Sequence, residues 1–133
     1  MVEASNGGKR GESRCGMVRV RARREEGQLL EVEVSGHAGY KEKGMDIVCA
    51  GISAITLGTA NALVSLLDVD AVSEIGQGGY IVFRLPRNLS KEVSERAALI
   101  LEGMLVALKA LEESYPEHLQ VEDPDSSRQN FRS

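Results

Sequence analysis

Hydrophobic and polar residues alternate along two neighbouring runs in the first third of the chain. The run from Met17 to Arg24 places aliphatic side chains on one side and arginines on the other, and the run from Leu30 to Ser35 sets aliphatic side chains against glutamates. A period of two residues is typical of half-buried strands. The link Glu25-Glu26-Gly27 suits a hairpin turn. With Val20 facing Val32, the hairpin is expected to form cross-strand ion pairs between its arginines and glutamates.

A long segment without charge follows this hairpin, from Ile47 to Leu67. It is long enough to span a bilayer, but five Ser, Thr or Asn residues and two glycines dilute its hydrophobicity. We therefore predict a buried core helix from about residue 46 to 68, central in the fold. Small residues would allow another backbone to approach it closely: Ala50, Gly51, Ala54, Gly58 and Ala62.

The second half of the chain repeats the order of two strands and a helix. Val69–Ile75 and Tyr80–Leu85 flank Gly76-Gln77-Gly78-Gly79, which predicts a second strand pair. Ser90 caps a predicted helix over residues 91–115. The order ββαββα predicts an α+β fold in which a mostly antiparallel sheet packs against two helices. The apolar residues of the second helix recur at helical spacing: Val93, Ala97, Ile100, Leu101, Met104, Leu105, Leu108 and Leu111.

Both ends of the chain differ from this core in composition. Residues 1–15 are polar and rich in glycine, which is typical of a flexible leader, and residues 117–133 form an acidic polar tail, expected to be disordered from about 122. The net charge is −4, but residues 1–24 carry seven Lys or Arg and two Glu, a balance of +5. Such a basic segment can contact RNA or an acidic partner. A solvated strand face is the simpler interpretation.

The composition argues against several classes of protein and site. The absence of Trp and an aromatic content of 4% argue against a base-stacking surface for single-stranded nucleic acid. Two cysteines make no disulfide framework, so a reducing cytoplasm is the natural compartment. Residues 1–15 lack the apolar core of a secretory signal. The His and Cys residues lack zinc-ligand spacing, and no P-loop motif is present.

One scarce histidine and one scarce cysteine lie 12 positions apart, at His37 and Cys49, in a chain with two of each. A thiol is a workable nucleophile when an imidazolium and a helix N-terminus lower its pKa. Cys49 falls near the start of the predicted helix, and His37 falls at the end of the second strand. Each residue also has an ordinary interpretation, because buried inert cysteines and surface histidines are both common.

Four nearby residues fit the same interpretation. Asp46 either orients the histidine or stabilises the helix start. Ser53, one turn after the cysteine, either donates a hydrogen bond to the site or bonds back to its own helix. Gly36 and Gly39 flank the histidine, and either let a loop open for a peptide or serve as ordinary turn glycines.

The combined spacing resembles the signature of one family. The strings Gly36-His37-Ala38 and Gly44-x-Asp46-Ile47-Val48-Cys49-Ala50-x-x-Ser53-Ala54 are similar to those of the bacterial ribosomal-processing cysteine protease (Prp) family. The resemblance extends from about residue 16 to 115 and implies a cysteine protease domain over 16–116. It implies Cys49 as the nucleophile and His37 as its base, with Asp46 and Ser53 in supporting roles and Gly36 at the hinge of a loop that moves for substrate.

The same resemblance implies an activity, a substrate and a compartment. Family members are cytoplasmic endopeptidases that remove a short N-terminal extension from a large-subunit ribosomal protein, the bacterial L-twenty-seven protein, and they commonly form homodimers. The expected chemistry is acyl transfer without a cofactor, a metal or a membrane, with N–H groups of the helix start holding the oxyanion. The competing interpretation is a non-catalytic ribosome-associated binding module that uses the basic N-terminal segment.

Overall fold

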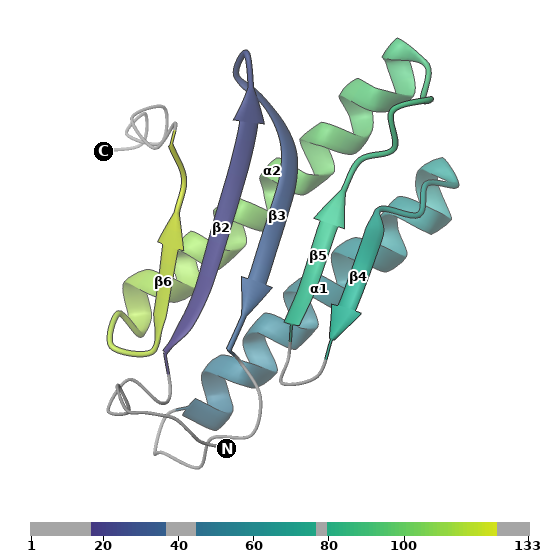
Figure 1. Cartoon of the computed structure of the whole chain (residues 1–133). Coiled ribbons are helices and arrows are strands. Elements are labelled where there is room, and N and C mark those ends of the chain that lie inside the picture. The colour runs from purple at the N-terminus through teal and green to yellow at the C-terminus, as the bar shows by residue number, and fades with distance from the viewer. Residues whose placement is uncertain (1–16, 37–44, 77–79, 125–133) are drawn as a thin grey trace.

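Two helices cover one face of a five-stranded sheet in the computed structural model, which describes residues 17–36, 45–76 and 80–124 (Figure 1). The sheet order is β4-β5-β3-β2-β6, and every neighbouring pair is antiparallel except β2 and β6. The predicted α+β class with a mostly antiparallel sheet is therefore confirmed. The elements are β2 (Val18–Glu25), β3 (Gln28–Ser35), α1 (Met45–Leu67), β4 (Val72–Gly76), β5 (Tyr80–Arg84), α2 (Lys91–Ser114) and β6 (Leu119–Glu122).

The β2–β3 hairpin forms as predicted, but its register differs by two residues. Val20 pairs with Val34, not with Val32. The reason is a two-residue turn in which Glu26 and Gly27 both have positive φ angles, of 53° and 83°. Such turns match the twist of the flanking strands. A register shift beyond Arg23 then adds one residue to β3.

This bulge changes which leucine faces the helices. Leu29 is fully buried, whereas the adjacent Leu30, expected on the apolar face, is only half-buried. A bulge places two residues opposite one, so the alternation of faces shifts by one position there. Arg24 lies opposite Leu29 and shares its side of the sheet.

The prediction for the second helix is confirmed. The Ser90 side chain accepts a hydrogen bond from the Val93 N–H, which caps the helix. The predicted apolar stripe of α2 packs against the sheet, with Leu101, Leu105 and Leu108 almost completely buried. The second strand pair also forms, as β4 and β5.

The first helix was predicted to be a buried core helix, central in the fold, and this was wrong. α1 lies at one edge of the helical layer, behind β4 and β5 (Figure 1). Val48, Ile52 and Leu63 are fully buried, but the opposite side exposes Leu57 at 57% and Leu66 at 72%. By length and hydropathy alone, α1 is the single helix among the described residues that matches a membrane span. Periodicity was uninformative here because both faces of the helix are apolar.

The segment assigned to a polar tail begins with a strand that was not predicted. Leu119–Glu122 forms β6, parallel to β2, so that the order of elements is ββαββαβ. Four residues with two apolar side chains are too short to show a period against their charged surroundings. The Val18 N–H donates to the His118 carbonyl, and the Glu112 side chain accepts from the Val121 N–H.

A buried ion cluster closes this end of the sheet. Arg24, with a side chain 5% exposed, donates to both Asp123 carboxylate oxygens at 2.9 Å and to Glu102 of α2 at 2.6 and 3.0 Å. Lys109 of α2 donates to Asp123 at 3.0 Å. The cluster joins β2, α2 and the residue that follows β6, and the Asp123 and Glu102 carboxylates raise the pKa of Arg24.

Candidate functional site

Cys49 is the fifth residue of α1, and α1 begins near the end of the molecule where β3 finishes and β2 begins (Figure 1). It is half-buried and packs against the hydrophobic core. The first four N–H groups of a helix have no partner within the helix. In α1 these include the N–H groups of residues 45–47, so the donors available to an oxyanion precede the cysteine by about one turn or less.

Two features of the described surroundings raise the pKa of the Cys49 thiol. Burial raises the pKa of the Cys49 thiol above its ordinary value, and the Asp46 carboxylate raises it further. Both effects oppose the lowering that a helix N-terminus provides.

Replacing Asp46 with asparagine is expected to speed alkylation of Cys49 by iodoacetamide at pH 7.5, by roughly twofold or more. Removal of the carboxylate lowers the thiol pKa, and the thiolate fraction rises at any pH below that value. The measurement is the rate of carbamidomethylation at Cys49, followed by peptide mass spectrometry. Asp70→Asn, beyond the other end of α1, is the matched control and should leave the rate unchanged. Slower alkylation in Asp46→Asn would mean that Asp46 acts mainly by orienting a cationic partner.

The two other predicted residues of α1 have different surroundings. Asp46 is exposed and lies within the first turn of the helix, so it is not the capping residue that precedes the helix. Ser53 is half-buried one turn after Cys49. Thr56 and Thr59 donate to carbonyls of their own helix, whereas the Ser53 hydroxyl has no hydrogen-bond partner within residues 17–36, 45–76 and 80–124.

Gly36 directly follows β3 and has a conformation that other residues avoid. Its φ angle is +89°, and a Cβ atom placed on it would lie 3.0 Å from the carbonyl oxygen of Met17. Backbone angle and close approach both require glycine here. The glycine thereby fixes the direction in which the chain leaves the sheet toward residue 37. His37 and Gly39 lie outside the described residues, so their predicted roles remain predictions.

Replacing Gly36 with alanine is expected to lower the free energy of unfolding by about 1–3 kcal/mol, because alanine adopts this φ angle only with strain. The measurement is urea denaturation followed by circular dichroism. Gly103→Ala is the matched control, since Gly103 lies inside α2 with nothing within 4 Å of the added methyl group. That variant should gain about 0.5–1 kcal/mol. Equal stability of the two variants would contradict the conformation described for Gly36.

Small residues of α1 permit close packing at one of the predicted positions. A Cβ atom on Gly51 would lie 3.1 Å from Leu111 of α2, whereas Gly58 has nothing within 4 Å. Ala50 and Ala54 are exposed. Gly51 is two residues from Cys49, so it sets the packing of α2 against the N-terminal part of α1. In the part of the chain that the structure describes, no group of three His, Cys, Asp or Glu residues could hold a metal ion.

Comparison with known proteins shows the family of this chain. The family model described as cysteine protease Prp matches residues 17–120. The ribosomal processing cysteine protease Prp of Bacillus subtilis is 39% identical over 94 residues, which is 70% of this chain and 84% of that protein. Its counterpart in Staphylococcus aureus is 37% identical over 98 residues, covering 73% and 89% of the two chains.

Solved structures agree with the sequence comparisons. A Streptococcus mutans protein superposes with a TM-score of 0.72 at 33% identity, covering 84% of this chain and 97% of that one. The S. aureus protease Prp bound to a substrate peptide gives a TM-score of 0.69 at 34% identity, covering 80% and 99%. A second S. aureus structure contains a covalently linked product peptide. The chain belongs to the cysteine protease Prp family.

Proposed function

We propose that this protease removes the N-terminal extension of the bacterial L-twenty-seven ribosomal protein, with Cys49 as nucleophile and His37 as general base. The observation that carries the proposal is the position of Cys49, a half-buried thiol on the first turns of α1. Gly36, whose strained φ angle directs the chain out of β3, immediately precedes the histidine. A relative with a covalently linked peptide supports a covalent intermediate.

The reaction is acyl transfer in two steps. His37 takes the thiol proton, and the Cys49 sulfur attacks the scissile carbonyl carbon to form a C–S bond while N–H groups of the α1 start stabilise the oxyanion. The C–N bond then breaks, and the histidine gives its proton to the leaving amine. Water attacks the thioester, releases the acyl fragment as a carboxylic acid and restores the thiol. No cofactor takes part.

The high thiol pKa fits this order of events. Burial and Asp46 raise the pKa of the Cys49 thiol, and an imidazolium beside the sulfur lowers it. A nucleophile that works as a reduced thiol fits the proposed cytoplasmic location.

The experiment that tests the proposed substrate is cleavage of the purified ribosomal protein precursor, carrying its N-terminal extension. The expected result is one cut that separates the extension from the body of the protein, mapped by mass spectrometry of both fragments. A precursor whose extension has been replaced by a Gly/Ser segment of the same length is the control and should stay intact. Equal cleavage of the two precursors would contradict the assigned substrate.

The alternative function is a non-catalytic module that contacts RNA through its basic segment. The described part of that segment does not support this alternative. Arg19 and Arg21 form ion pairs with Glu122, and Arg23 forms one with Glu31. Arg24 is buried in its ion cluster. Each of these arginines has a carboxylate partner within the fold, which favours the structural interpretation of the basic strand.

We also propose that the protease is a homodimer whose subunits meet along the exposed face of α1. This face carries Ile47, Ala50, Ala54, Leu57, Asn61 and Val64, all exposed and spaced alternately by three and four residues. Such spacing gives a continuous stripe that packs against another helix. The stripe has no charge along about 30 Å of helix. A second copy of α1 matches it in length, and the alanines permit close approach.

Replacing Leu57 with glutamate is expected to convert a two-chain species into a single chain, because the charge would be buried at the centre of the stripe. The measurement is light scattering after size-exclusion chromatography. Leu99→Glu, which alters an equally apolar and exposed residue of α2, is the matched control and should keep the mass of two chains. A single-chain mass for the unaltered protein would contradict this interface.

A further inference from the structure

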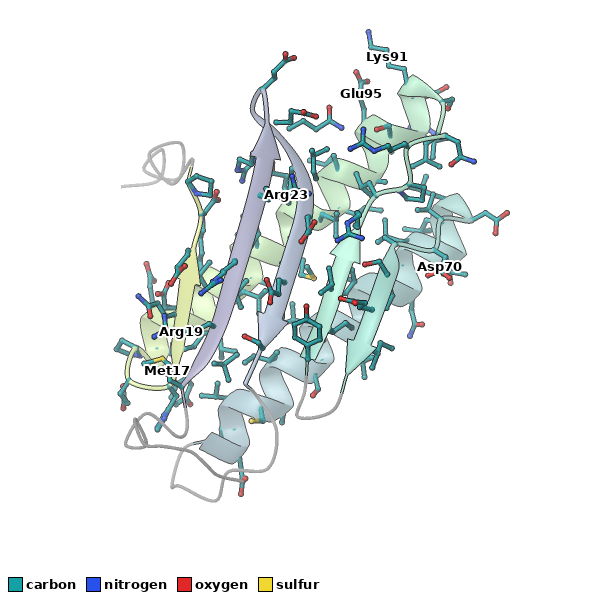
Figure 2. The ribbon with its side chains drawn as sticks, in the orientation of Figure 1. Met17, Arg19, Arg23, Asp70, Lys91 and Glu95 are labelled. Atoms are coloured by element: carbon teal, nitrogen blue, oxygen red, sulfur yellow. The ribbon has the colours of Figure 1, made fainter. Side chains whose placement is uncertain are left out.

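A second candidate binding site lies at the end of the molecule farthest from Cys49. A pocket of about 600 Å³ opens where the β2–β3 hairpin, the segment after β5 and the first turn of α2 meet. Asp70, just beyond the other end of α1, forms part of its wall. In Figure 2, Arg23 and Asp70 lie toward the end at which α2 begins, marked by Lys91, whereas Met17 marks the opposite end. The part of α1 that follows Cys49, about 27 Å long, separates Asp70 from the cysteine.

Three arginines line this pocket, and the structure holds two of them in place. Arg23 of β2 and Arg84 of β5 both donate to one oxygen of Glu31, on the strand between them, at 2.9 and 3.1 Å. The hydrogen bond from Arg23 is the main cause that lowers the pKa of Glu31, so the carboxylate stays charged and keeps both side chains oriented. Arg84 uses only its Nε atom in this contact.

The remaining donors are available to a ligand. The two terminal nitrogens of Arg84 and the whole guanidinium of Arg87 form no hydrogen bond with the residues that the structure describes. Guanidinium groups bind phosphate oxygens in pairs, with geometry that a single ammonium does not provide. The start of α2 borders the pocket at Ser94 and adds a favourable potential for an anion.

The rest of the pocket wall suits the organic part of a ligand that carries an anionic group. Leu30, Leu85 and Pro86 supply an apolar surface next to the arginines. Asp70 stands across the pocket as an acceptor, with one carboxylate oxygen held by the Val72 N–H at 3.2 Å. Its other oxygen can accept from hydroxyl or amino groups, and it would repel a second anionic group. Pockets of this size commonly hold small organic ligands.

We infer that this pocket binds the phosphate of a nucleotide, with Arg84 and Arg87 on the phosphate, Asp70 on ribose hydroxyls and the base against Leu85 and Pro86. The nucleotide is either free or the end of an RNA strand, since both present the same chemistry. This inference is independent of the peptidase activity, because no residue of the pocket lies near Cys49.

The test is calorimetric titration of the protein at low salt with inorganic phosphate, ADP, a hexamer of adenylate and a glutamate-rich peptide. ADP is expected to bind saturably and more tightly than inorganic phosphate. Arg87→Gln should weaken ADP binding about tenfold, as expected for loss of a charge-assisted hydrogen bond. Arg21→Gln, on the same strand as Arg23 but outside the pocket, is the matched control and should bind ADP within about twofold of the unaltered protein.

The Asp70→Asn variant tests whether the pocket recognises the nucleoside or attracts any anion. Recognition of the nucleoside predicts that this variant has a smaller preference for ADP over inorganic phosphate. Tighter binding of the hexamer than of ADP would identify RNA as the source of the ligand, and equal binding would identify the free nucleotide. Absence of saturable ADP binding, an unchanged affinity in Arg87→Gln, or tighter binding of the acidic peptide than of ADP would each overturn the inference.

Discussion

Replacing Cys49 with alanine is expected to abolish peptide cleavage, with a loss of kcat/KM on the order of 10⁴-fold or more. The sulfur forms the bond to the acyl group, and no neighbouring group substitutes for it. The first turns of α1 remain folded, because alanine is a better helix former than cysteine and Cys49 is only half-buried. The measurement is the rate of cleavage of a peptide that spans the junction of the extension.

Two further variants separate the role of Cys49 from a general loss of structure. His37→Ala should fall to a similarly low rate, since the nucleophile and its base act as a unit. Cys15→Ala, which removes the other thiol of the chain, should cleave at the rate of the unaltered protein. Residual cleavage in Cys49→Ala comparable with that of Cys15→Ala would refute Cys49 as the nucleophile.

Replacing Asp123 with alanine is expected to lower the free energy of unfolding by about 3–5 kcal/mol, the usual cost of removing one member of a buried ion pair. The Asp123 side chain is fully buried and accepts hydrogen bonds from Arg24 and Lys109. Its loss leaves the buried guanidinium with one carboxylate partner, Glu102, and with the Gly27 carbonyl. The measurement is urea denaturation at one protein concentration, which keeps any effect of association constant.

Arg96→Ala is the control for this prediction, because it breaks the Arg96–Glu92 pair on the exposed surface of α2. That change should alter the free energy of unfolding by no more than about 0.5 kcal/mol. A loss in Asp123→Ala no larger than in Arg96→Ala would contradict the view that this cluster fastens β6 and the residues after it to the sheet.

The sequence predicted those elements whose pattern is long or whose ends carry a chemical signal. The hairpin strands and α2 were predicted because alternation and helical spacing persist over many residues, and Ser90 marked the start of α2. β6 was missed because a four-residue edge strand owes its place to partners far away in the sequence, such as Val18 of β2. Its parallel pairing leaves no local signal.

Charge and burial were harder to predict than secondary structure. Arg24 was counted among the basic residues of an exposed strand, but it lies opposite Leu29 on the helical side of the sheet and is buried. Its partners Glu102 and Asp123 are 78 and 99 residues away, a pairing that only the fold produces. The exposed face of α1 was misjudged because an apolar stripe has the same composition whether it faces a core or a partner.

In the candidate site, too, some features could be predicted from the sequence and others could not. The spacing of Asp46, Cys49 and Ser53 on one helix followed from the sequence, and the structure places all three on α1. The raised pKa of the Cys49 thiol did not follow, because it depends on how deeply the side chain packs. The conformation of Gly36 could not be predicted from the sequence either. Its close contact is with Met17, which directly precedes the neighbouring strand β2.

Trapping the covalent intermediate tests the central claim most directly. The protein is mixed with a peptide that spans the extension junction, quenched in acid within the first turnover and digested for mass spectrometry. The account predicts that the N-terminal fragment of the substrate is attached to Cys49 as a thioester that hydroxylamine removes. Attachment to Cys15, or rapid cleavage with no adduct on any cysteine, would contradict it.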